Sequence, residues 1–315
     1  MLFRKILKLM TLPFTLQQLR MLKAIASEKN FTRAAEILYV SQPTLSKQFK
    51  MLESRLGISL IDRQNKNFSL TEAGEMFLRY SERILTLCEE SCRSLNDLKN
   101  GDRGILKIGT SQTIGTYLLP RIISLFAQNY PQVTFKIYVD STRKIAKSII
   151  DSQIDIAIVG GFIPGNLTDN LQIEDFVEDD LNLILPKFHP VALSEEKFIK
   201  KNDLYHLNFI TLKSTSTIQK LINIILNQNN IQTQQFNVVM ELNSIEALKT
   251  AVSLGLGAAF ISSSTIEKEI QLNTISVINI EDIKLTRSIS ILVNPQSYKS
   301  KTFQFFYRAL SQLKI

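Results

Sequence analysis

The segment SQPTLSKQFK, residues 41–50, holds the side chains whose types and spacing best suit a chemical task. Ser41 is a preferred N-cap residue, Pro43 suits a first helical turn, and Gly57 suits the residue after a helix end. Between them an apolar stripe recurs at helical spacing, formed by Leu45, Phe49, Leu52 and Leu56. The pattern therefore predicts one helix with a buried apolar face and an exposed polar face.

The polar face of this helix carries groups of the kinds that can contact duplex DNA. Gln42, Thr44 and Ser46 can hydrogen-bond base edges, and Pro43 can touch a thymine methyl group. Lysines on the same face can reach phosphates or guanine, and other basic residues before and after the helix can hold the backbone. The candidate DNA-binding residues are Thr32, Arg33, Gln42, Pro43, Thr44, Ser46, Lys47, Lys50, Arg63 and Lys66. Taken alone, they could equally form a solvated helix face.

The net charge of +8 is confined to the first quarter of the 315 residues. Residues 1–71 contain 12 Lys and Arg against 4 Asp and Glu, whereas residues 72–315 contain 25 of each class. A basic module beside a neutral body indicates that only the module meets an anionic polymer. Since no apolar run approaches the roughly 20 residues of a membrane helix, we expect no membrane partner.

The elements around this segment outline a winged helix-turn-helix domain over residues 14–71. Two short helices, capped by Thr15 and Asn30, precede the helix that begins after Ser41, so the helix-turn-helix itself spans about 31–50. Residues 58–70 then read as two short strands with a basic tip, RQNKN.

Residues 72–98 form one long helix in the sequence pattern. An a/d stripe runs along it, formed by Phe77, Tyr80, Ile84, Leu87, Ser91, Leu95 and Leu98. Such a stripe must pack on the rest of the chain or pair with a second copy, and we expect pairing. Cys88 and Cys92 lie beside it, where packing in the seam is the interpretation we favour over a redox sensor.

Residues 104–315 alternate strand-like and helical runs, which predicts mainly parallel sheets covered by helices. The expected strands lie at 105–109, 133–139, 154–159, 181–185, 208–212, 236–240, 257–261, 275–280 and 287–293. The expected helices lie at 115–129, 142–152, 216–229, 244–254 and 300–313. We expect two lobes, the first from 104–175 and 281–315 and the second from 176–280. The fold class is thus multidomain α/β.

The stretch from residue 30 to 74 resembles the DNA-binding module of LysR-type transcriptional regulators. The resemblance rests on AAxxLxxSQPTLSxQ, LExxLGxxLxxR and LTxAG at the spacing of that family. It implies sequence-specific regulation of transcription, a homodimer made by the long helix, a dimer of such dimers, and RNA polymerase as a further candidate partner. Where this chain has Lys66 the family often has arginine, so bidentate phosphate contact is lost there.

The resemblance also implies that residues 104–315 adopt the two-lobed fold of solute-binding proteins, with a small effector bound between the lobes. Loops after parallel strands, topped by helix N-termini, suit an anionic ligand. The candidate effector-binding residues in such loops are Thr110, Ser111, Gln112, Thr113, Ser141, Gly160, Gly161, Thr211, Asn243 and Ser244. Each of them could instead be an ordinary helix cap. We expect no cofactor and no metal.

Residues 12–46 are similar to regulators of the RuBisCO genes in cyanobacteria and red-lineage plastids. The 39 Ile and 20 Asn against 14 Ala fit an AT-rich genome such as a plastid genome. A plastid location is therefore expected, with the bacterial cytoplasm as the alternative, and a LysR-type regulator of another operon as the alternative function.

Enzymatic function is not expected, because no catalytic constellation emerges. His189 and His206 stand in no metal-ligand spacing, and the paired acids Asp179–Asp180 and Glu195–Glu196 read as solvated surface. A solute-binding receptor and a DNA-compacting protein remain alternatives. The receptor would lack a use for the basic module, and the compacting protein would lack a use for the two lobes.

Overall fold

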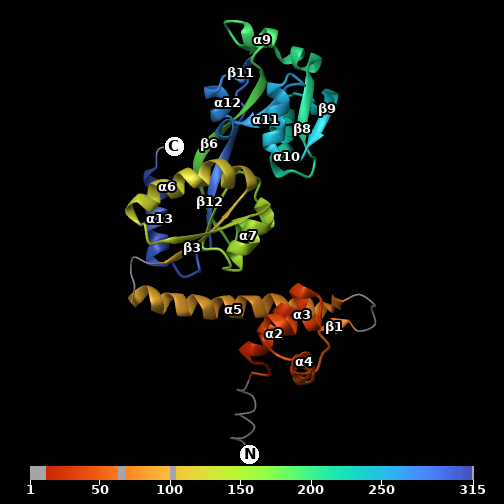
Figure 1. Ribbon diagram of the computed structural model, residues 1–315, viewed down its shortest axis with the longest axis vertical. Coiled ribbons are helices and arrows are strands. Elements are labelled where there is room, and N and C mark those ends of the chain that lie inside the picture. The colour runs from red at the N-terminus through yellow and green to blue at the C-terminus, as the bar shows by residue number, and fades with distance from the viewer. Residues whose placement is uncertain (1–11, 63–67, 100–103, 314–315) are drawn as a thin grey trace, which may run out of the picture. The chain divides into compact units, whose positions relative to one another are not determined.

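The computed structural model describes residues 12–62, 68–99 and 104–313 (Figure 1). The chain divides into two compact units, residues 1–96 and 97–315, and each is described by itself.

The first unit begins with three helices whose ends follow local capping rules. Thr15 and Gln18 form a reciprocal capping box, Asn30 caps the second helix, and Ser41 caps the third. Gly57 ends the third helix with a φ of 70°, a left-handed conformation that glycine adopts without strain. The helices are α2 (Leu16–Glu28), α3 (Phe31–Ile37) and α4 (Gln42–Leu56), as the sequence pattern predicts.

The core of this unit comes from the apolar stripes of α2 and α4. Leu22, Ile25, Leu45 and Leu52 are fully buried, and Phe49 meets the ring of Phe31 edge to face. Burial of this apolar surface fixes α4 in place and leaves its other face to solvent.

Strands β1 (Ile61–Asp62) and β2 (Ser69–Leu70) pair antiparallel and confirm the predicted wing, while its tip lies outside the described residues. Helix α5 (Glu72–Lys99) starts against this wing. A Cβ on Gly74 would lie 2.0 Å from the carbonyl oxygen of Leu60, so only glycine permits this close approach.

The second unit is built on a mixed sheet rather than a mainly parallel one. In its described part, this sheet has three parallel and four antiparallel strand pairings, and two further strands form a separate parallel pair. The prediction was wrong because the long strand β6 (Gln172–Pro186) pairs antiparallel with β12 (Thr286–Val293) and with two further strands. The acidic residues along β6 hid its first half from an apolar pattern, which predicted 181–185 alone.

The other strands and helices of this unit match most of the predicted runs within a few residues. The strands are β3 (Ile105–Thr110), β4 (Thr134–Val139), β5 (Ile156–Val159), β7 (Phe198–Ile199), β8 (Asn208–Leu212), β9 (Asn237–Leu242), β10 (Ala259–Ser262) and β11 (Ile275–Ile280). The α-helices are α6 (Leu119–Asn129), α7 (Thr142–Ile150), α8 (Gly165–Thr168), α9 (Pro190–Leu193), α10 (Thr217–Gln228), α11 (Ile245–Ser253), α12 (Glu267–Gln271) and α13 (Lys301–Gln312). Short 3-10 turns η2 (Lys201–His206), η3 (Thr233–Gln235) and η4 (Ser263–Thr265) and the π-helical turn η1 (Ile114–Leu118) complete them. The sequence pattern had missed β7, α8, α9, α12 and the 3-10 turns.

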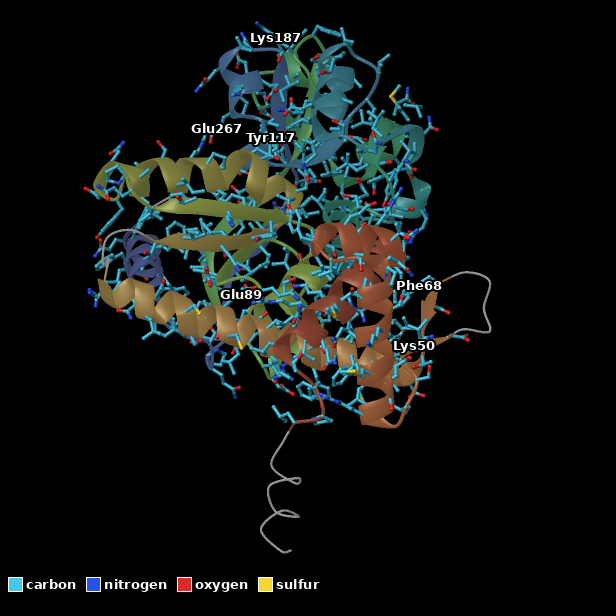
Figure 2. The ribbon with its side chains drawn as sticks, turned by 60° about the horizontal axis from the view of Figure 1, so that its bottom comes forward. Lys50, Phe68, Glu89, Tyr117, Lys187 and Glu267 are labelled. Carbon is cyan, nitrogen blue, oxygen red and sulfur yellow. The ribbon has the colours of Figure 1, made fainter. Side chains whose placement is uncertain are left out.

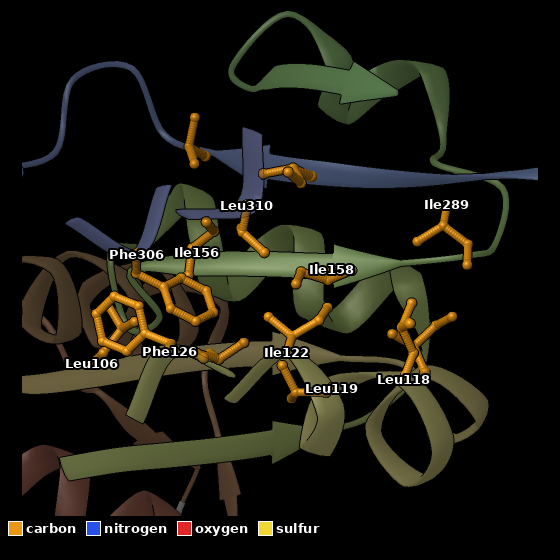
Figure 3. Close-up of a cluster of buried hydrophobic side chains, with 14 of the residues drawn as sticks. Leu106, Leu118, Leu119, Ile122, Phe126, Ile156, Ile158, Ile289, Phe306 and Leu310 are labelled. Carbon is orange, nitrogen blue, oxygen red and sulfur yellow. The ribbon is translucent and has the colours of Figure 1, made fainter. Parts of the chain in front are cut away.

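Separate hydrophobic clusters show that the unit has two lobes (Figures 1 and 3). One cluster joins Leu106 and Ile158 of the sheet to Phe126 of α6 and Phe306 of α13. Another forms around β8, β10, β11 and α10, with Phe209 fully buried. The two lobes meet at the paired strands β6 and β12. A cleft beside these strands would therefore be lined by residues of both lobes.

Candidate functional site

The N-terminal half of α4 presents an exposed polar surface in the first unit. Gln42 Nε2 donates to Ser46 Oγ at 3.1 Å, and the hydroxyls of Ser41 and Thr44 lie 2.7 Å apart. These bonds link surface groups to one another and to the cap, so the side chains are ordered without being covered. The surface can therefore meet base edges with donors and acceptors already in place.

The cations around this surface are available for phosphates. Lys47 and Lys50 are exposed on α4, and no described residue forms an ion pair with either. Figure 2 labels Lys50. Thr32 and Arg33 are exposed in the first turn of α3, where Asn30 Oδ1 accepts both of their backbone N–H groups. Pro43 is exposed as well. The predicted contacts Arg63 and Lys66 lie outside the described residues.

Two adjoining cavities occupy the cleft of the second unit. The first, here the α10–α11 cavity, has a volume of about 520 Å³, and the second, the α7–α10 cavity, about 300 Å³. Gln112, Thr113, Thr215 and Ser216 line both, so the two are continuous. Their combined volume falls in the range of small-molecule sites.

Three helix N-termini point into this cleft. Ser141 of α7 and Ser216 of α10 stand at N-cap positions without a side-chain capping bond, whereas Ser244 caps α11 through the N–H of Ala247. Unbonded backbone N–H groups and the helix dipole favour negative charge at such ends. At α7 this place is already taken by the carboxylate of Asp140. The backbone N–H of Ser141 donates a hydrogen bond to that carboxylate and lowers its pKa. An external anion is therefore better placed near α10, whose N-terminus has neither a side-chain cap nor an acid in its first turn.

The rim of the α10–α11 cavity supplies a cation to that place. Lys213 lines the cavity, is exposed, and forms no ion pair with any described residue. Glu246 is the acid on the same cavity, and it shares Lys249 Nζ, at 3.0 Å, with Glu269, at 2.9 Å. Lys213 is therefore the cation of this cavity that no described carboxylate pairs with.

A buried ion pair lies behind the α7–α10 cavity. Arg287 Nε donates to Asp179 Oδ2 at 2.7 Å and its Nη1 donates to the carbonyl of Gly160 at 3.1 Å. Both charged residues are almost fully buried, so the expectation that Asp179 is solvated was wrong. The partners lie on β6 and β12, 108 residues apart, where a linear pattern could not pair them.

Two buried hydroxyl groups near this ion pair have no hydrogen-bond partner among the described residues: Ser111 Oγ and Thr142 Oγ1. Ser111 lines the α7–α10 cavity, and Thr142 lies behind Gly161, where a Cβ would come within 2.5 Å of its hydroxyl oxygen. Because an unsatisfied buried hydroxyl is costly, both groups suit a ligand or water in the cavity.

Side chains of the two lobes meet at one edge of the cleft. Tyr117 of η1 donates its hydroxyl to Glu246 of α11, and Arg121 Nη1 of α6 donates to Glu267 Oε1 of α12 at 2.6 Å (Figure 2). Partial burial, then this hydrogen bond, raises the pKa of Tyr117 above its ordinary value. The bond from Arg121 lowers the pKa of Glu267. These bonds link the two lobes through solvent-exposed side chains beside the cavity.

The structure brings most of the predicted effector residues to this cleft. Thr110 is an exception, because it is buried and donates to the carbonyl of Ile158 at 2.9 Å. Thr211 is another, because it lines a separate hollow between β8 and α10. The residues at the cleft are Ser111, Gln112, Thr113, Ser141, Gly160, Gly161, Asn243 and Ser244. Sequence reasoning missed Tyr117, Lys213, Glu246 and Arg287. Of these only Lys213, two residues after the predicted Thr211, carried a local signal.

In the described ranges, no cluster of three His, Cys, Asp or Glu side chains could hold a metal ion. Among the helices described, none combines the length and the apolar character needed to cross a membrane.

Family models match both units of the chain. Residues 16–75 match the bacterial regulatory helix-turn-helix proteins of the lysR family, and residues 99–314 match the LysR substrate binding domain.

Relatives over nearly the whole chain carry one description, "Probable RuBisCO transcriptional regulator". The one from Trieres chinensis is 66% identical over 305 residues, which is 97% of this chain and 99% of the relative. The one from Synechocystis sp. is 50% identical over 297 residues, 94% of this chain and 86% of the relative.

Solved structures with the same fold include full-length CbnR complexed with its target DNA. That likeness has a TM-score of 0.69 at 21% identity and covers 95% of this chain and 99% of that one. The regulatory domain of Synechocystis CcmR in complex with 2-PG aligns with a TM-score of 0.57 at 22% identity, covering 66% of this chain and 96% of that one. The two family models and the relatives together show that the chain is a DNA-binding transcriptional regulator of the LysR family.

Proposed function

We propose that this regulator controls the RuBisCO genes, reading duplex DNA with the N-terminal half of α4. The exposed polar and basic surface of α4, held by the Ser41 cap and the buried stripe, carries the proposal. A major groove admits one helix, and a helix presenting Gln42 at its start can place an amide against adenine. The description of the relatives supports the RuBisCO genes as the target.

Binding of the purified protein to the RuBisCO promoter and to a scrambled duplex, at fixed salt, tests this proposal. We expect Gln42→Ala to reduce the discrimination between the two by roughly 1–3 kcal/mol, the usual value of a bidentate base contact. Gln17→Ala, a matched change on the exposed side of α2, should leave it unchanged. Equal affinity of the unaltered protein for both duplexes would contradict sequence-specific control.

The proposal includes an anionic effector in the cleft, with its negative group near Lys213 and the N-terminus of α10. The unpartnered hydroxyls of Ser111 and Thr142 support the proposal that the rest of the effector is polar and lies in the α7–α10 cavity. A structural neighbour holds 2-PG in its regulatory domain, which makes this compound a sensible first probe. The chain would thus act by binding and not by catalysis.

Calorimetry with 2-PG, phosphorylated sugars of carbon fixation and nicotinamide nucleotides tests the effector site. Lys213→Ala should weaken a compound that binds by roughly fivefold to tenfold, as expected for loss of a charge-assisted contact. Lys220→Ala, an exposed lysine on α10 that lines neither cavity, is the control. An equal effect of both substitutions would place the anion elsewhere.

We also propose that α5 pairs with a second copy, and that such dimers assemble further in pairs. Tyr80, Leu87 and Leu95 on its a/d stripe are 57%, 65% and 62% exposed, although apolar stripes at this spacing normally pack. Two copies would hold two α4 helices at a fixed spacing and would require an inverted-repeat site. Algal relatives and the Ile- and Asn-rich composition support a plastid location, where RNA polymerase would be the further partner.

A further inference from the structure

The turn between α3 and α4 contains a residue in a left-handed conformation. Tyr39 has a φ of 54°, its N–H donates to Glu36 O at 3.1 Å, and the following N–H of Val40 donates to Ala35 O at 3.0 Å. These bonds end α3 and turn the chain toward the Ser41 cap. The conformation is therefore required by the turn and is not a local accident.

Tyrosine is an unfavourable residue for this conformation. Glycine adopts a positive φ without strain, and Asn and Asp tolerate it. The described residues besides Tyr39 and glycine that adopt it are Asn230, Asn273, Asp282, Lys29, Ser152 and Lys197, none of which is bulky at Cβ or aromatic. Tyr39 is the only aromatic residue with a positive φ in the described part of the chain. A large side chain at such a position is an outlier that points to a use for the side chain.

The side chain of Tyr39 has no interaction partner within the described part of the chain. Tyr39 is 96% exposed, more than any other large apolar residue described. Among the described residues nothing hydrogen-bonds its hydroxyl, no aromatic ring contacts its ring, and no cation lies over it. The side chain therefore contributes no packing that would offset the strain of its backbone.

Its position points to duplex DNA as the missing partner. Tyr39 lies two residues before Ser41, beside the end of α4 where Gln42 and Thr44 are exposed. When a helix end enters a major groove, the residues next to it face the sugar-phosphate strands that border the groove. Tyrosine hydroxyls are regular donors to phosphate oxygens in such interfaces.

We propose that Tyr39 is a DNA-binding residue whose hydroxyl donates a hydrogen bond to a phosphate bordering the site of α4. The proposal rests on entry of α4 into the groove. A contact of this kind fixes the orientation of α4 and carries no sequence information. Because the group is neutral, the contact releases no additional counterion from the DNA.

Affinity of the full-length protein for the RuBisCO promoter and for scrambled duplex, across a salt series, tests the proposal with Tyr39→Phe and Tyr39→Gly. Both should weaken binding roughly tenfold per half-site, because a hydrogen bond to a charged group is lost. The factor should be the same on both duplexes and the salt slope unchanged. Ile58→Ala, an exposed apolar residue beyond the other end of α4, should bind like the unaltered protein.

Thermal unfolding of Tyr39→Gly separates DNA contact from a structural role. Its midpoint should stay equal or rise, because glycine relieves the positive φ. A lowered midpoint, a shift to smaller oligomers, or unaltered affinity in Tyr39→Phe would each overturn the proposal.

Measuring Gln42→Ala in the same series distinguishes the proposal for Tyr39 from the proposed recognition of bases by α4. If Gln42→Ala loses discrimination while Tyr39→Phe binds normally, only the role of Tyr39 is wrong. If Tyr39→Phe weakens binding and Gln42→Ala keeps discrimination, the tyrosine contact stands and base reading by Gln42 is wrong. If neither changes DNA binding, both ideas are overturned.

Discussion

Asp179 and Asp180 are neighbours in the sequence with opposite surroundings. Asp179 is buried, pairs with Arg287, and accepts hydrogen bonds from Ser262 Oγ at 2.6 and 2.8 Å. Asp180 faces the other side of β6 and meets Lys284 at 3.2 Å, where both side chains are largely solvated. Successive side chains of a strand point to opposite faces of the sheet, so one of these carboxylates is buried and the other is partly exposed to solvent.

This contrast predicts unequal costs for two chemically identical substitutions. Asp179→Asn should lower the free energy of unfolding by about 3–5 kcal/mol, because the Arg287 charge stays buried without its counter-ion. Asp180→Asn should change it by no more than about 0.5 kcal/mol. Urea denaturation of the two proteins measures the difference, and similar midpoints would show that the Arg287 pair contributes little.

At the scale of elements, α5 has more apolar surface than the described chain covers. Leu87 and Leu95 are exposed on this helix of 28 residues. An exposed apolar stripe of this kind is typical of an interaction surface. Cys88 and Cys92 are both free, with Cys88 half-buried and Cys92 exposed. Pairing of α5 helices would remove the leucines from water.

A charge on the α5 stripe should therefore break the assembly. Leu87→Asp should shift the protein to monomers in sedimentation velocity at micromolar concentration, because a carboxylate would have to enter an apolar seam. Arg79→Ala, at an exposed position of α5 that is not on the stripe, is the control and should assemble normally. Intact oligomers in Leu87→Asp would place the interface on another surface.

At the scale of the whole molecule, the net positive charge lies in the part of the chain that contains the DNA-binding domain. The net charge of +8 belongs to residues 1–71, and the remaining residues sum to zero. Binding to a polyanion then depends on salt through the first unit alone, since each phosphate contact releases counterions.

Two exposed lysines test this division. Lys50→Ala should weaken binding to every duplex and flatten the slope of log affinity against log salt by about one unit. Lys187→Ala, in the second unit, should leave the slope unchanged (Figure 2). A smaller slope with Lys187→Ala would show that the second unit also touches DNA.

The local elements were predictable because their causes are local. The caps at Thr15, Asn30 and Ser41, and the left-handed glycine at 57, act within four residues of their partners. The mixed sheet was not predictable, because the pairing of β6 with β12 depends on segments about a hundred residues apart. Thr211 shows the same limit, since the outward or inward side of a strand end is set by the sheet around it.

The sequence by itself determined the helix-turn-helix, the basic first quarter and the long apolar stripe, because each is written in residues that lie close along the chain. Only the tertiary structure decided which loops form the cleft. Arg287, Tyr117 and Glu246 reach it from strands and helices that are remote in sequence, and two neighbouring aspartates differ because β6 buries one of them. Burial and long-range pairing are properties of the packed chain, so no local pattern could reveal them.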